Sequence, residues 1–151
     1  MSIIYILSIV FILLSAQLKR KDGSLNLEQD DLPYFRGECD DLINELTQAV
    51  DLLAENPKDS DTINSMFRAI HTLKGNAKIA GSVELENLCS LIEDVLEAFR
   101  QGKLEPDQKL LQLANLSIDG LKKMLDELYE LKEADSAHPK LIAALQFVVQ
   151  R

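Results

Sequence analysis

One histidine, His71, has neighbours that suit phosphoryl chemistry. At helical spacing Lys74 lies one turn beyond it with Gly75 alongside, and Arg68 and Lys78 flank the same region. A phosphorylated imidazole brings close to two negative charges and three acceptor oxygens, which the lysines can offset. Gly75 leaves open surface for a second protein to bring a phosphoryl-bearing carboxylate close. His71 is therefore the candidate phosphoacceptor.

A nucleophilic imidazole also needs a hydrogen-bond acceptor that fixes its tautomer. His71 falls roughly 90 to 110° from the apolar centre of its helix, at the margin of the buried stripe. Glu93 has the same angular position on the next helix, so antiparallel packing would bring the two side chains together. Other acids on that helix compete for the role, namely Glu84, Glu86, Asp94 and Glu97. The second histidine, His138, is interpreted as an exposed loop side chain.

Helical periodicity governs the chain from residue 30 onward, and it predicts the elements that must position these groups. Capping residues, prolines and glycines divide the segment into five helices. The first helix is expected at residues 31–55, and the second runs from a cap among Asp59, Ser60 and Asp61 to about residue 80. The third runs from a Ser82 cap to about residue 101, the fourth from Pro106 to about residue 132, and the fifth over residues 139–149. The predicted fold is all-α, an up-and-down antiparallel four-helix bundle with an additional C-terminal helix packed across it, preceded by an N-terminal apolar helix.

The N-terminal segment differs from the rest of the chain. Residues 3–14 are almost unbroken apolar sequence, residues 2–18 carry no charge, and Lys19, Arg20 and Lys21 follow. A membrane anchor, a buried apolar helix, and a secretory signal or artefactual start all stay open. The anchor is favoured, since about 17 residues can just span a bilayer and a signal would place its basic residues first. The expected organisation is an apolar segment at 1–21, a linker at 22–29 and the bundle at 30–151.

Composition excludes several classes of function. The basic cluster adds +3 to a net charge of −9, so the chain after residue 21 sums to −12, which excludes nucleic-acid binding. Cys39 and Cys89 lack metal-ligand spacing and read as buried thiols in a reduced, cytoplasmic compartment. A metal-binding bundle would need Glu-x-x-His pairs, and the sequence has none. We therefore expect no metal site and no cofactor in this chain.

The segment from Met66 to Ala77 resembles the phosphoacceptor helix of histidine phosphotransfer domains, most of all the N-terminal domain of chemotaxis-type histidine kinases. The similarity includes the core H-x-x-K-G, the preceding F-R-A, and Gly81 ten residues after the histidine. It continues on the next helix as L-x-x-L-x-x-x-I-E-D at 85–94 and F-R-Q-G at 99–102. The resemblance spans about residues 30–132 and is specific over 63–102.

This resemblance implies that His71 receives the phosphoryl group on its outward nitrogen and that Glu93 accepts a hydrogen bond from the other nitrogen. Lys74 would shape the phosphate surface together with Gly75. Arg68 is expected on the surface that meets the partner.

Two positions depart from the pattern of this family. Ser90 stands where chemotaxis members often carry a second histidine, which reduces any wider hydrogen-bond network. Lys78 stands where small residues are usual, and a long cation there would alter the choice of partner.

The sequence thus predicts a phosphorelay module without its own kinase active site. It has no Gly-rich nucleotide loop and no length for an ATP-binding domain, so Mg²⁺ is expected on the partner. The partners would be a response-regulator receiver domain, a histidine kinase or both. We expect a monomeric, cytoplasmic bundle, tethered to the membrane through residues 3–18 if the anchor holds. The alternative is a helical protein-interaction module in which His71 is incidental.

Overall fold

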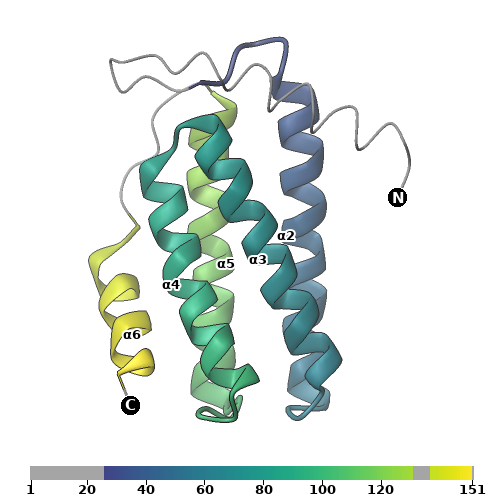
Figure 1. The fold of residues 1–151 in the computed structure, drawn as a ribbon, viewed down its shortest axis with the longest axis vertical. Helices are drawn as coiled ribbons and strands as arrows, with labels where there is room; N and C mark the ends of the chain where they lie inside the picture. The colour runs from purple at the N-terminus through teal and green to yellow at the C-terminus, as the bar shows by residue number, and fades with distance from the viewer. Residues whose placement is uncertain (1–25, 131–136, 151) are drawn as a thin grey trace.

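The computed structural model describes residues 26–130 and 137–150, and within these ranges all regular structure is helical (Figure 1). The five helices are α2 (Leu32–Glu55), α3 (Ser60–Ala80), α4 (Val83–Arg100), α5 (Gln108–Tyr129) and α6 (Pro139–Val149). For the residues that the structure describes, the expectation of an all-α fold with five helices is confirmed. The apolar segment 1–21, with the possible tether at 3–18, lies outside the described residues. No helix within the described ranges is long and apolar enough to cross a membrane.

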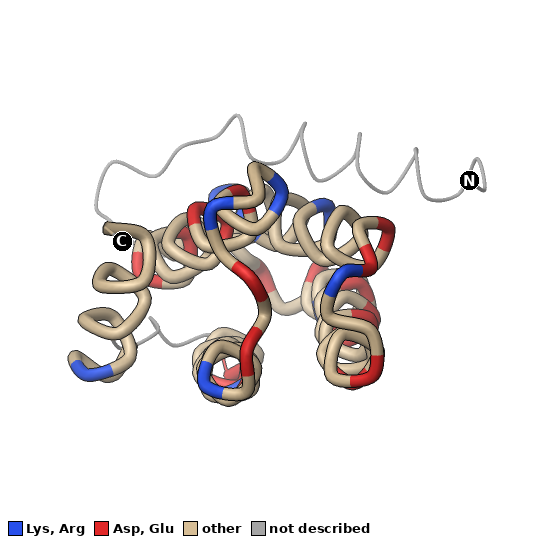
Figure 2. Tube along the Cα trace, turned by 90° about the horizontal axis from the view of Figure 1, so that it is seen from below, with Lys and Arg blue, Asp and Glu red and all other residues tan. Residues whose placement is uncertain are grey.

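Helices α2 to α5 form an up-and-down bundle in which each helix reverses the direction of the one before it (Figure 1). Each contacts two of the others, with α3 packed between α2 and α4, and α5 closing the ring against both. Helix α6 packs outside this ring against α4 and α5. Acidic positions are spread over the bundle helices with basic ones between them (Figure 2). The α3–α4 pair is the one that presents the predicted site.

Two helix starts show how capping sets the boundaries. Asp59 caps α3, because its side chain accepts a hydrogen bond from the backbone amide of Asp61. The expected start of the fourth helix at Pro106 was two residues early. Asp107 is the N-cap of α5, with an extended backbone, and its Oδ1 accepts from the amide of Leu110 at 2.8 Å. Proline fixes only its own φ, whereas the aspartate satisfies a free amide of the first turn, so the helix begins after Asp107.

The end of α3 is fixed by a glycine and by a contact from the chain before α2. Gly81 has φ 78°, in the left-handed region that favours glycine. The backbone amide of Asn26 donates to the carbonyl of Ala80 at 2.8 Å, and its side-chain amide donates to Ile79 at 3.3 Å. The terminal carbonyls of the helix that carries His71 are thereby satisfied.

The core lies where the four bundle helices face one another, and both cysteines belong to it. Cys39 and Cys89 are free thiols with fully buried side chains, as the sequence predicted. Burial raises the pKa of each thiol to about 12, since the thiolate would lose its hydration. The largest fully buried side chains are Leu46, Ile70, Leu73, Leu85, Leu88, Leu121, Leu125 and Leu128.

Candidate phosphotransfer site

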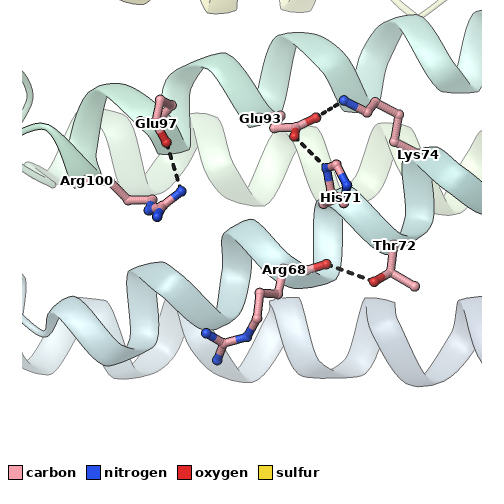
Figure 3. A network of polar contacts seen from close by, with 7 residues as sticks. All are labelled: Arg68, His71, Thr72, Lys74, Glu93, Glu97 and Arg100. Atoms are coloured by element: carbon pink, nitrogen blue, oxygen red, sulfur yellow. Dashed lines mark hydrogen bonds and ion pairs between the residues drawn. The ribbon is translucent and has the colours of Figure 1, made fainter.

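The antiparallel packing of α3 and α4 brings His71 and Glu93 together (Figure 3). Nδ1 of His71 lies 2.7 Å from Oε1 of Glu93, a normal hydrogen-bond distance. The two side chains differ in exposure, since 65% of the histidine side chain is accessible and only 13% of the glutamate. The carboxylate is therefore held in the seam between the helices while the imidazole stands at the surface.

Lys74 occupies the other oxygen of the same carboxylate. Its Nζ donates to Oε2 of Glu93, so both glutamate oxygens have a partner (Figure 3). Burial by itself would raise the pKa of Glu93, but the hydrogen bonds and charge of Lys74, together with the contact to His71, outweigh it and lower that pKa. Glu93 is thus an ionised group at neutral pH.

An ionised carboxylate can only accept hydrogen bonds, and this decides the tautomer of the imidazole. In the pair with Glu93, Nδ1 of His71 must carry the proton and donate it. In the neutral ring, Nε2 then holds a lone pair. The geometry therefore leaves the outward nitrogen of an exposed histidine free to act as a nucleophile.

The remaining predicted surface residues lie at different places around His71. Gly75 is exposed, and a Cβ added there would meet nothing within 4 Å, so the surface beside the imidazole is open. Lys78 is exposed two helical turns beyond His71 on the same face of α3. Arg68 is also exposed, but its side chain points away from the imidazole in Figure 3. The structure therefore gathers His71, Lys74 and Gly75 in one place and leaves Arg68 at its edge.

The structure also shows where Glu97, another acid of α4, and the second histidine lie. Glu97, one turn beyond Glu93, pairs with Arg100 at 2.9 Å instead of with His71. His138 is exposed as expected, but its Nδ1 also accepts from the amide of Lys140 at 3.2 Å and caps α6. No group of three or more potential metal-ligating side chains occurs within residues 26–130 and 137–150.

An aromatic contact at the site was not foreseen from the sequence. The ring of Phe67 stacks beside the imidazole of His71, with centroids 6.3 Å apart and an interplanar angle of 11°. The guanidinium carbon of Arg100 also contacts this residue, 4.4 Å from the centre of the Phe67 ring. The spacing of four residues between Phe67 and His71 was the available signal, because such pairs are neighbours on a helix.

Comparison with known proteins identifies the family of this domain. Residues 32–131 match the model of the Hpt domain family, which covers well over half of the chain. The chain belongs to the Hpt domain family. Hpt domains are histidine phosphotransfer modules, so this domain carries phosphoryl groups and is not itself a kinase.

Its curated relatives include much longer chemotaxis proteins. The chain is 37% identical over 102 residues to the chemotaxis protein CheA of Borreliella burgdorferi, which covers 67% of this chain and 12% of that protein. With CheA of Rhizobium meliloti the identity is 33% over 87 residues, covering 58% of this chain and again 12% of the relative. The chain thus spans about an eighth of the length of these two relatives.

Two solved structures have folds similar to this bundle. The CheA phosphotransferase domain from Thermotoga maritima superposes with a TM-score of 0.64 at 29% identity, covering 68% of this chain and 97% of that one. The phosphorylated P1 domain of CheA3, in complex with CheY6 from R. sphaeroides, gives a TM-score of 0.76. It covers 82% of this chain and 98% of that one, and at 19% identity it supports the fold alone.

Proposed function

We propose that His71 is the phosphoacceptor of this Hpt domain and that it exchanges the phosphoryl group with receiver aspartates or with a histidine kinase. The observation that carries the proposal is the hydrogen bond from Nδ1 of His71 to the ionised Glu93, which leaves Nε2 exposed with its lone pair. Glu93 is thus assigned the role of orienting the histidine.

The reaction is a displacement at phosphorus. The lone pair of Nε2 forms the N–P bond as the bond from phosphorus to the donor oxygen breaks, and the donor leaves with that electron pair, as a carboxylate if it is a receiver aspartyl phosphate. His71 keeps its proton on Nδ1, so the ring gains positive charge during the transfer. The Glu93 carboxylate stabilises this charge through the existing 2.7 Å hydrogen bond.

The neighbouring residues shape the surface on which donor and acceptor meet. Lys74 holds the Glu93 carboxylate in position and adds positive charge near the phosphoryl group. Gly75 admits the partner because no side chain stands there. Lys78 and Arg68 are exposed cations that would contact the partner farther from the reacting nitrogen.

The partner of this reaction would be a receiver domain, a kinase or both, and Mg²⁺ would be bound by that partner. A domain of the same fold was solved in its phosphorylated form in complex with CheY6, and by analogy we propose a receiver as one partner.

We also propose a monomeric, cytoplasmic domain, with residues 3–18 as a possible membrane tether. Fractionation of the chain with and without residues 1–21 tests that tether, and identical distribution of both forms would refute it.

The central test is incubation with a phosphorylated receiver or an autophosphorylating kinase, followed by detection of an acid-labile, base-stable phosphoryl group. His71→Gln should abolish labelling, and His138→Gln is the matched control that should be labelled like the wild type. Labelling of His71→Gln to the wild-type level would refute the proposal. Failure of every form to become labelled, with unchanged binding of receiver to His71→Gln, would favour the interaction module instead.

A further inference from the structure

The imidazole of His71 is held by two contacts of different kind. Glu93 accepts a hydrogen bond at one ring nitrogen. Phe67 lies one turn earlier on α3 with its ring nearly parallel to the imidazole, at 11° and 6.3 Å between centroids. A single hydrogen bond still allows the ring to tilt about the donor atom, whereas a flat neighbour restricts the plane of the ring.

Phe67 is in turn covered by a fixed cation. The guanidinium of Arg100 lies over its ring with the central carbon 4.4 Å from the centroid. Nη1 of Arg100 donates to Oε2 of Glu97 at 2.9 Å, and Nε2 of Gln101 donates to the other oxygen of that glutamate at 3.0 Å. A continuous set of contacts therefore runs from the last turn of α4 to the imidazole of His71.

We propose that Phe67 and Arg100 are positioning residues that hold the plane of the His71 imidazole for phosphoryl transfer, an inference that rests on the function proposed above. The lone pair of Nε2 lies in the ring plane, so attack on phosphorus in line with the leaving oxygen requires that plane to have one orientation. Glu93 decides which nitrogen reacts. Phe67, held by Arg100, decides in which direction that nitrogen points.

The position of Phe67 makes a test by substitution practical. The side chain is only partly buried and packs against the margin of the core, so a leucine there keeps much of the apolar contact. Phe67→Leu removes the flat ring face, and Phe67→Tyr keeps it. Arg100→Gln removes the cation from the ring. The matched control is Arg36→Gln, because Arg36 lies 4.8 Å over the ring of Tyr129, between α2 and α5, away from His71.

The experiment measures single-turnover transfer from a phosphorylated receiver over a range of receiver concentrations. Phe67→Leu should lower the maximal rate by about 2- to 12-fold without changing the half-saturating concentration, from the usual strength of one aromatic pair. Arg100→Gln should lower that rate by about 2- to 5-fold, as expected for one exposed cation–π contact. Phe67→Tyr and Arg36→Gln should stay within about twofold of the wild type.

Nuclear magnetic resonance relaxation of the His71 ring gives a second readout that requires no phosphorylation. The ring should be rigid in the wild type and in Phe67→Tyr and mobile in Phe67→Leu. Equal maximal rates and equal ring mobility in the leucine and tyrosine variants would overturn the inference, as would an effect confined to the half-saturating concentration. If the wild type were labelled at His71 while these variants did not differ, only the positioning role would fail. If the wild type were not labelled, the proposed function would fail. The mobility of the His71 ring would then be the one measurement that tests whether Phe67 holds the imidazole.

Discussion

Replacing Glu93 by glutamine tests the core of the proposed chemistry with little change in shape. Glutamine keeps an oxygen that can accept from Nδ1 of His71, but it has no charge to stabilise the ring as it becomes cationic. A hydrogen bond to a charged group contributes about 1.5 to 3 kcal/mol and a neutral one about 0.5 to 1.5 kcal/mol. For the 2.7 Å contact between His71 and Glu93 the difference is about 1 to 1.5 kcal/mol, or about a 5- to 13-fold slower transfer.

The assay is single-turnover transfer from a phosphorylated receiver at saturating concentration, with folding checked by thermal unfolding. Loss of the partner of Lys74 should cost the fold only about 1 kcal/mol, because the ammonium group keeps some access to water. Glu86→Gln is the matched control, since it removes the same charge from the same face of α4 two turns earlier. A Glu93→Gln variant that transfers as fast as Glu86→Gln would refute the assigned role of the carboxylate.

Four further outcomes follow from the structure. The fold lowers the pKa of Glu93, so the ionised carboxylate should stabilise the fold at pH values above the ordinary glutamate pKa near 4.3, and this stabilisation should be lost as the pH falls through the lower pKa of the folded state. The difference in unfolding free energy between wild type and Glu93→Gln should therefore shrink between pH 7 and pH 3. Gly75→Gln should fold normally and accept phosphoryl groups from phosphoramidate, a small donor, but react more slowly with a phosphorylated receiver in a concentration series, because its side chain fills the open surface. Gly81→Ala should lower the unfolding free energy by about 1 to 2 kcal/mol in urea titrations, because φ is 78° there and Asn26 lies 3.3 Å from the added carbon. Cys39 and Cys89 should react with a thiol reagent at pH 8 only after unfolding in urea, because both are buried and each has a pKa of about 12; rapid labelling of the folded chain would contradict this burial.

Most of the fold could be predicted because its helices are strongly amphipathic and clearly punctuated. The α2 and α6 boundaries expected from the sequence agree with those observed to within one residue. The start expected for α5 was wrong. Pro106 and Asp107 are both residue types that often begin a helix, and only the backbone conformation shows that Asp107 caps it. The role of Asn26 at the end of α3 could not be seen either, since it joins residues more than 50 positions apart.

The site residues also fall into those that the sequence could predict and those that it could not. His71, Lys74 and Gly75 lie within five residues of one helix, so the helical repeat alone places them together. Phe67 also obeys this repeat, and its spacing of four residues from His71 allows a contact, but an aromatic residue next to an apolar stripe is usually part of a core. Arg100 comes from another helix, so its place over Phe67 depends on how α3 and α4 pack.

The sequence by itself determined the phosphoacceptor candidate, the cations beside it and the bundle that carries them, because each depends on spacing within one helix. Spacing left several acids of α4 open as partners of His71, and only the resemblance to a known family favoured Glu93. The tertiary structure shows that Glu93 lies against His71, since that depends on how far one helix is shifted along the other. A shift of one turn, about 5.4 Å, would present Glu97 instead of Glu93. The observed packing holds Glu93, partly buried, between Lys74 and His71, and there a single carboxylate can both stay ionised and fix the tautomer of the proposed nucleophile.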